Sequence, residues 1–474
     1  MASISNTGIE THGVMLSPSM ILEAEMVPAS LSYKTSQQAS SKLNTLANVD
    51  GDPLGAGMKF RVIAYIQSDG SYQDYKDYTV GQFADALALD IGAAYNLIAY
   101  SYGKTTLPAI TVGETTSINS ATLNYRYLLN KDFMYQNIIY TPGNIENSIN
   151  LTLRHKLSLI TATVNSMIGN INSITSANIS PTYANGTIPL STGKITYTGA
   201  SGSVGLSFPS GDALSKTATP VLVSADTNGT LMGDFTASIG VNGAASKTLT
   251  LTNAFKITPE YKSNLNINLR TCGAYLGPNQ TQWTEFMCQN LGATVGTNPF
   301  SPVAANHGSK YQWGENTSAL TQAQDQANSG TISGWSSAIA ANGSWSDTAK
   351  GPNDPCPTGY KVPSKTEWNA VLTNNTIERT NTSWANSSTN FGSALYIKDP
   401  VSNNRTLMLP SAGNRYNVNG TLSHRGDTGI YWTSTWGFNA GTPIADDLEF
   451  DATTALVNRW YTRAMGYSVR CITE

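Results

Sequence analysis

Four cysteines are the residues of this chain most able to do chemistry, and all of them lie in its C-terminal part. They are Cys272, Cys288, Cys356 and Cys471. Cysteines can hold zinc, but no C-x-x-C is present and the spacings do not fit a zinc site. Four cysteines allow three disulfide pairings, and disulfides would place the chain in an oxidising compartment. A set of four buried, reduced thiols is the alternative.

No catalytic constellation accompanies these cysteines. The sequence contains no H-E-x-x-H, no G-x-S-x-G and no phosphate-binding glycine loop. Its four histidines are scattered: His155 alternates with leucines in a predicted strand, whereas His307 and His424 lie in predicted loops. We therefore predict that the chain is not an enzyme and uses no cofactor.

An acidic run near the C-terminus could bind a cation. Carboxylate oxygens are the ligands that Ca²⁺ prefers. In a strand, Asp447, Glu449 and Asp451 would point to one side. A solvated strand face explains the same pattern and is the favoured interpretation, so we predict no metal and keep calcium as the alternative.

Aromatic side chains are the best candidates for contacts with a ligand. All nine tryptophans lie between Trp283 and Trp460. The candidate ligand-binding residues are Trp335, Trp345, Trp384, Arg415, Tyr416, Trp436 and Trp460. The alternative is that most of these tryptophans fill an aromatic core. Trp283 and Trp368 are assigned to the core, because each occupies the apolar stripe of a predicted helix.

Composition excludes several other classes. Charged residues make up 12% of the chain and the net charge is −3, without the basic footprint of a nucleic-acid-binding protein. No stretch approaches the ~20 apolar residues that cross a bilayer. No export signal follows Met1. We expect an extracellular protein whose export signal is absent from this sequence.

The chain divides near residue 270, because the first 270 residues contain neither tryptophan nor cysteine. That first part shows short strands with turn signals between them, which is typical of β-sandwiches. Predicted strands include residues 59–66, 72–80, 95–102 and 151–159. We predict an N-terminal extension (1–20), two sandwiches (21–142 and 143–270) and a C-terminal domain (271–474).

The C-terminal domain is predicted to mix helices with strands. Ser364 and Glu367 form a capping box, so a helix should start at Lys365. A second helix is predicted over residues 281–291, with Gly292 after its end.

The predicted sandwiches resemble the fimbrillin family of Bacteroidetes, the Mfa-like subunits of type V pili. The matching blocks are Met58-Lys-Phe-Arg-Val-Ile-Ala-Tyr65, Tyr95-Asn-Leu-Ile-Ala-Tyr100 and Leu151-Thr-Leu-Arg-His-Lys-Leu-Ser158. The resemblance covers roughly residues 20–270 and implies two tandem transthyretin-like sandwiches.

The C-terminal domain resembles the FISUMP (Fibrobacter succinogenes major paralogous) family of surface proteins. The matching blocks occur in order: Cys272-Gly-Ala-Tyr275, Glu285-Phe-Met-Cys-Gln-Asn-Leu-Gly-Ala293, Tyr311-Gln-Trp-Gly314, Gly343-Ser-Trp-Ser-Asp-Thr-Ala-Lys350, Asn353-Asp-Pro-Cys-Pro-Thr-Gly-Tyr360, Leu409-Pro-Ser-Ala-Gly413, Tyr431-Trp-Thr-Ser434 and Ser468-Val-Arg-Cys471. The resemblance implies a C-type-lectin-like α+β fold. Among the three pairings we favour Cys272–Cys288 and Cys356–Cys471, since lectin-like folds often close such a long loop.

Together the resemblances imply a cell-surface adhesin at a fimbrium or the outer membrane. Fimbrillin-type subunits assemble by strand exchange with other pilus subunits. This chain ends inside the lectin-like domain, which suits a tip subunit that accepts a strand and gives none. Residues 21–27 are a candidate strand to fill the groove until assembly, and the loop 32–52 has no arginine for arginine-specific maturation.

Two alternatives remain. One is a lipid-anchored or secreted glycan-binding protein outside a pilus. The other is a lectin-fold oxidase, against which the lack of a spare cysteine pair counts. The ligand of the C-terminal domain would be a glycan or a protein on a target surface.

Overall fold

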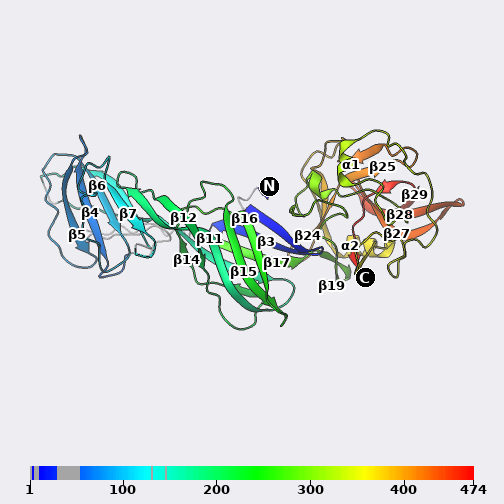
Figure 1. The fold of residues 1–474 in the computed structure, drawn as a ribbon, viewed down its shortest axis with the longest axis horizontal. Coiled ribbons are helices and arrows are strands. Elements are labelled where there is room, and N and C mark those ends of the chain that lie inside the picture. The colour runs from blue at the N-terminus through cyan, green and yellow to red at the C-terminus, as the bar shows by residue number, and fades with distance from the viewer. Residues whose placement is uncertain (1–2, 5–9, 29–53, 130–131, 145–146) are drawn as a thin grey trace. The chain divides into compact units, whose positions relative to one another are not determined.

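The structure is a computed structural model that describes residues 3–4, 10–28, 54–129, 132–144 and 147–474. The side chains of residues 3, 4, 10, 11, 28 and 458–460 are outside this description, as is the whole of the predicted loop 32–52. The fold is mainly β, as predicted, with many sheets and few helices (Figure 1). No helix in the described ranges is long and apolar enough to cross a membrane.

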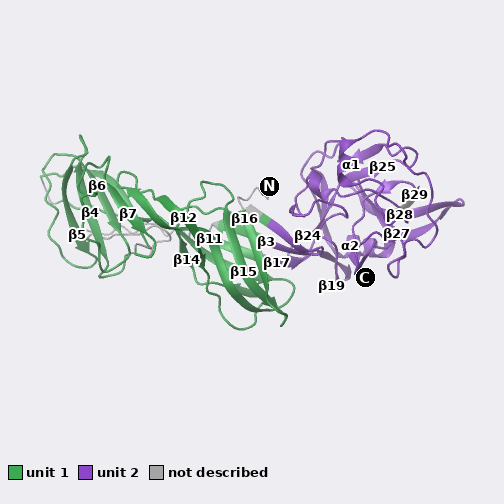
Figure 2. Ribbon diagram, viewed as in Figure 1, with its two compact units in different colours: residues 1–12, 24–267 green, residues 13–23, 268–474 purple. Residues whose placement is uncertain are grey.

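Two compact units make up the chain (Figure 2). Unit 1 comprises residues 1–12 and 24–267, and unit 2 comprises residues 13–23 and 268–474. The boundary between the units at residue 268 is close to residue 270, the position after which tryptophan and cysteine occur in the sequence. No sequence pattern indicates that residues 13–23 belong with the C-terminal part.

Three antiparallel sheets involve the strands of unit 1. The first has the order β5 (Tyr72–Thr79), β4 (Lys59–Ile66), β6 (Tyr95–Ser101), β8 (Met134–Tyr140) and β9 (Arg154–His155). The second has the order β1 (Ser3–Ile4), β2 (Glu10–Ser17), β3 (Met20–Pro28), β17 (Lys262–Thr271), β10 (Ser158–Ser166) and β13 (Ser215–Thr217), with β14 (Val221–Val223) beside β10. The third has the order β12 (Thr196–Gly205), β11 (Ile171–Pro189), β15 (Gly233–Val241) and β16 (Lys247–Phe255), with β7 (Thr122–Arg126) beside β11.

The strands predicted at 59–66, 72–80 and 95–102 are confirmed to within one residue. They form because these segments are rich in β-branched and aromatic residues, and β4 and β6 are buried on both faces. The end of β11 extends the core of this region, since Ile188 and Leu190 pack in one cluster with Ile63 and Tyr100. The core of the first predicted sandwich therefore draws on residues beyond position 142.

Unit 2 contains small sheets, short helices and long loops. Its sheets are β18 (Gly273–Gly277) with β19 (Thr281–Glu285); β20 (Tyr311–Gln312), β30 (Gly466–Tyr467), β25 (Ala412–Arg415) and β26 (Leu422–Arg425); β21 (Tyr360–Lys361) with β31 (Ile472–Thr473); β22 (Thr376–Arg379), β23 (Ala394–Lys398) and β24 (Arg405–Pro410); and β27 (Gly429–Asn439), β28 (Thr442–Phe450) and β29 (Ala455–Thr462). Its helices are η1 (Ala304–Asn306), α1 (Gln322–Ala327) and α2 (Lys365–Asn374).

One of the two predicted helices is confirmed and the other is wrong. Helix α2 begins at Lys365 behind the expected capping box, and its Trp368 is fully buried. The helix predicted over 281–291 is instead strand β19 followed by an irregular segment. The reason is that these residues form a hairpin, in which Trp283 lies opposite Tyr275. The Trp283 ring packs directly on Gly273, where it occupies the space that a side chain at position 273 would need.

Candidate functional site

The four cysteines form two buried disulfides in unit 2. Cys272 is bonded to Cys288, and Cys356 to Cys471, which closes a loop of 115 residues. This is the favoured pairing, and the alternative of reduced thiols is wrong. All four residues are at most 5% exposed. Such cross-links stabilise a fold mainly by restricting its unfolded chain.

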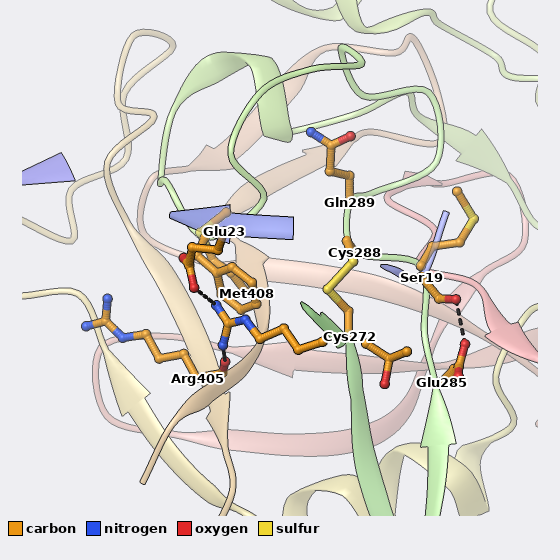
Figure 3. Close-up of a disulfide and its surroundings, with 12 residues drawn as sticks. Ser19, Glu23, Cys272, Glu285, Cys288, Gln289, Arg405 and Met408 are labelled. Atoms are coloured by element: carbon orange, nitrogen blue, oxygen red, sulfur yellow. Dashed lines mark hydrogen bonds and ion pairs between the residues drawn. A yellow bond between two sulfur atoms is a disulfide. The ribbon is translucent and has the colours of Figure 1, made fainter. Parts of the chain in front are cut away.

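The N-terminal segment 13–23 lies beside the first disulfide (Figure 3). The backbone amide of Cys272 donates to the carbonyl of Ser19 at 2.7 Å, and the amide of Cys288 donates to the carbonyl of Pro18 at 2.7 Å. The Ser19 hydroxyl donates to Glu285 Oε2 at 2.6 Å. Ile21 is fully buried in the cluster that contains both bonded cysteines. Unit 2 is therefore assembled from two separate stretches of sequence.

Three of the predicted ligand-binding tryptophans have structural roles. Trp345 is fully buried against Trp313, with ring centroids 5.4 Å apart, and its indole N–H donates to the Asn353 carbonyl. Trp335 is half-buried, and its ring packs closely against Gly420 and Gly466. A Cβ atom at either glycine would lie within 3 Å of the ring. Trp384 is half-buried, and its indole N–H donates to the Thr380 carbonyl.

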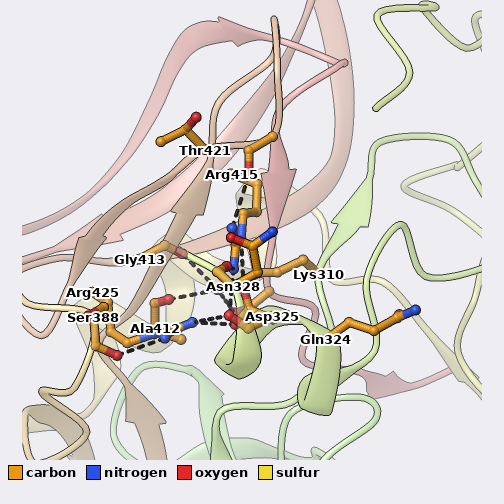
Figure 4. Close-up of polar contacts among 12 residues, drawn as sticks. Lys310, Gln324, Asp325, Asn328, Ser388, Ala412, Gly413, Arg415, Thr421 and Arg425 are labelled. Atoms are coloured by element: carbon orange, nitrogen blue, oxygen red, sulfur yellow. Dashed lines mark hydrogen bonds and ion pairs between the residues drawn. The ribbon is translucent and has the colours of Figure 1, made fainter. Parts of the chain in front are cut away.

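Arg415 is also structural and belongs to a buried cluster of charges (Figure 4). Its Nε donates to Asp325 Oδ1 at 2.7 Å, while Arg425 donates to Asp325 Oδ2 at 2.6 Å. Lys310 donates to the carbonyls of Ala412 and Gly413. Burial lowers the pKa of Lys310 to about 7. Since Arg415 and Asp325 are inaccessible, this cluster holds loops together and does not present a cation to a ligand.

The acidic run is divided between β28 and the turn that follows it. Asp451 lies beyond the strand, where its carboxylate accepts from the amides of Thr453 and Thr454. Asp447 is fully buried, so the expectation of a solvated face is wrong for it. Neither of its carboxylate oxygens has a hydrogen-bond partner among the described residues, and burial raises its pKa to about 8, with Glu449 adding to the shift. No group of three or more metal-ligating side chains exists within the described ranges.

The exposed aromatic residues of unit 2 gather in one region. Among the described side chains, those at least 37% exposed are Tyr416, Trp436, Phe438 and Tyr461. Trp436 lies opposite Ala445 on β28, which in turn lies opposite Tyr461 on β29. Residues opposite each other in antiparallel strands share a face, so Trp436 and Tyr461 flank the small Ala445.

Buried neighbours hold these rings in place. Trp436 packs edge-on against Phe438, and the buried guanidinium of Arg463 lies 5.4 Å from its ring centroid. Tyr461 packs edge-on against the buried ring of Tyr467. The rings of Trp436 and Tyr461 therefore each pack against a buried side chain.

A pocket of about 470 Å³ opens beside two of these rings, those of Tyr416 and Tyr461. It lies between the loop after β25, the β27–β28 hairpin and the end of β29. Its lining residues are Tyr416, Asn417, Asn439, Ala440, Thr442, Ile444, Tyr461, Thr462 and Met465. The hairpin tip has the two-residue turn Ala440–Gly441, in which both residues have positive φ. This turn places Asn439 opposite Thr442 at the pocket.

Among the exposed rings and the pocket-lining residues, two are candidates predicted from the sequence, Tyr416 and Trp436. Phe438, Asn439 and Tyr461 are not predicted. The side chain of Trp460, also a candidate, is outside the described residues. The alternation of Trp436 and Phe438 along a strand is a usable signal, because both must lie on one face. Nothing local indicates that Tyr416 lies near Tyr461.

Comparisons with known proteins give only remote similarities. No family model and no curated protein matches the chain. A candidate cell adhesion protein of Parabacteroides distasonis is 11% identical, over 54% of this chain and 87% of that one, with a TM-score of 0.34. A candidate cell adhesion protein of Bacteroides ovatus is 12% identical, over 48% and 92%, with a TM-score of 0.29. A fimbrial assembly protein of P. distasonis is 10% identical, over 48% and 86%, with a TM-score of 0.27. Similarities this low carry no argument about function.

Proposed function

We propose that the chain is a non-catalytic adhesin of the cell surface whose unit 2 is the recognition head. The observation that carries the proposal is the set of four exposed aromatic rings among the described side chains of unit 2, two of which, Tyr416 and Tyr461, line a pocket. Other tryptophans of unit 2, such as Trp313, Trp345 and Trp432, are buried in its core. Exposed Trp, Tyr and Phe on a supported surface are typical of binding hot spots.

Two features support export and argue against cysteine chemistry. Disulfides persist in oxidising compartments, and this chain has two. Redox-active cysteines need access to solvent or substrate, whereas these four are buried. The disulfides therefore fit structural cross-links better than the oxidase alternative.

Within this function, we place the chain at the tip of a pilus, where it would accept a strand from another subunit. Strand β31 (Ile472–Thr473) pairs with β21 (Tyr360–Lys361), and the neighbouring Cys471 is bonded to Cys356. These residues are paired and cross-linked within the head. The resemblance to fimbrillins supplies the expectation of strand exchange.

Adhesion assays with the whole chain test the proposal. Beads carrying the protein should adhere to target cells or to neighbouring bacteria, and Phe438→Ala should reduce that adhesion several-fold. Phe83→Ala is the matched control, because Phe83 is 97% exposed and lies in unit 1. Absence of adhesion, or equal loss in both variants, would contradict a recognition head at this surface.

Cell fractionation and mixing separate the tip from the alternative. A tip subunit should co-purify with pili and cap fibres of shaft subunits in vitro. Recovery in membrane or culture fluid without pili would instead favour the lipid-anchored or secreted glycan-binding protein.

A further inference from the structure

We propose that the pocket between Tyr416 and Tyr461 binds an uncharged sugar residue at the end of a glycan. This inference rests on the proposed function, because it names the ligand class of the same recognition head. It follows from three properties of the lining: its aromatic walls, its uncommitted polar groups and its lack of charge.

Aromatic rings form two of the pocket walls. Tyr416 is 53% exposed and Tyr461 is 37% exposed. A sugar ring has apolar C–H groups on its faces and hydroxyls around its edge. Tyrosine matches both, because it presents an apolar ring and a hydroxyl that can donate or accept. Elsewhere in unit 2, tyrosines such as Tyr431 and Tyr467 have their rings fully buried.

Four polar side chains at the pocket make no hydrogen bond within the described protein. They are Asn417, Asn439, Thr442 and Thr462. Some other asparagines of unit 2 are used within the fold, since Asn306 and Asn390 donate to backbone carbonyls. Amides and hydroxyls both donate and accept, as sugar hydroxyls do. The pocket therefore offers polar groups that can pair with a ligand.

None of the pocket-lining residues carries a charge. Two arginines among the described side chains are adjacent in sequence to a lining residue, and both are buried. Arg415 is 0% exposed and donates to Asp325, and Arg463 is 1% exposed and donates to the carbonyls of Ile444 and Ala340. A carboxylate, sulfate or phosphate in the pocket would lose water without gaining a counter-charge, which is costly. A neutral sugar has no such cost, and we therefore infer uncharged glycans over sialylated or sulfated ones.

The size of the pocket is compatible with this ligand. Its volume of about 470 Å³ falls inside the ~300–1,000 Å³ range of small-molecule sites. It is open to solvent on one side, so a terminal sugar can enter while the rest of the glycan stays outside.

The test is a glycan array probed with the whole chain. The array should carry neutral oligosaccharides that end in glucose, galactose, mannose or N-acetylglucosamine, beside their sialylated and sulfated forms. We expect binding to one or more neutral glycans, and at least tenfold weaker binding to their acidic forms. A preference for acidic glycans, or binding to none, overturns the inference.

Variants locate the binding. Tyr461→Ala and Asn439→Ala should weaken titrated binding of the best neutral oligosaccharide at least tenfold. Tyr261→Ala and Asn386→Ala are the matched controls, because both residues are exposed and lie outside the pocket, and each should stay within twofold of the wild type. A third variant, Thr442→Val, keeps the shape of the side chain and removes its hydroxyl, so it tests the polar contact where a larger truncation fails to fold.

The outcomes for the inference and for adhesion are distinguishable. A chain that adheres to cells while its pocket variants bind neutral glycans as the wild type does, or while no neutral glycan binds, refutes the sugar site and leaves the adhesin standing. A chain that adheres to nothing refutes the adhesin as well.

Discussion

Ile21 tests whether the N-terminal segment is part of the head. It is 0% exposed and packs in the main core cluster of unit 2 with Cys272, Phe286 and Trp368. Truncation of a buried isoleucine to alanine costs about 2–5 kcal/mol, because the lost contacts leave a cavity. Ile21→Ala should therefore lower the stability of unit 2 by about 3 kcal/mol. For a unit of this size that corresponds to a decrease in Tm of roughly 6–12 °C.

The positions of the tryptophans supply a selective assay for this change. All nine lie between Trp283 and Trp460, so tryptophan fluorescence reports on unit 2 alone. Chemical unfolding of the whole chain should show the tryptophan transition shifted to lower denaturant in Ile21→Ala. Ile139→Ala is the control, since Ile139 is 64% exposed in unit 1 and its truncation should cost less than about 0.5 kcal/mol.

A small shift would refute the reasoning. If Ile21→Ala moves the tryptophan transition no further than Ile139→Ala does, residues 13–23 are not part of the head's core. The same conclusion would follow if unit 2 unfolded identically with and without the N-terminal segment.

Three further predictions concern unit 2 and share the same fluorescence assay. Replacing Cys356 and Cys471 by serine removes the closure of a 115-residue loop and should cost about 4–5 kcal/mol, and a change below about 1 kcal/mol would show the bridge to be dispensable. The folded-state pKa of Asp447 is raised to about 8 from an unfolded value of 3.8, so folding holds its proton and stability should fall as pH rises from about 4 to 8. The slope of the unfolding free energy against pH is at most ~1.4 kcal/mol per pH unit. Asp447→Asn should remove this part of the pH dependence. Parallel stability-against-pH profiles of the variant and the wild type would contradict the prediction. Asp325→Ala leaves Arg415 and Arg425 without their shared carboxylate and should cost about 3–5 kcal/mol, whereas a near-neutral effect would show that the pair is not held by Asp325.

Local sequence patterns are enough to predict several features of the chain. The capping box at Ser364 and Glu367 specifies a helix start, because both partners lie within one turn. The strands at 59–66 and 95–102 follow from β-branched and aromatic runs. The favoured disulfide pairs are confirmed as well, although they follow from resemblance and not from spacing.

The same local reasoning fails where long-range pairing overrides it. Residues 281–291 have helical spacing of Trp283, Phe286 and Met287, but a hairpin with Tyr275 and the bond at Cys288 decide their conformation. A helical period says which residues share a face and not whether a neighbouring strand competes for the backbone.

The order of the amino acids is sufficient for the β class of the chain, its change of character near residue 270 and the positions of its best-capped helix and strongest strands. It is not sufficient to say which polar and aromatic side chains reach solvent, and that depends on the folded arrangement. Trp345, Arg415 and Asp447 resemble surface candidates in the sequence and are buried, whereas Tyr416 and Tyr461 meet at a pocket. Exposure follows from packing between strands and loops far apart in the chain, which no local spacing records.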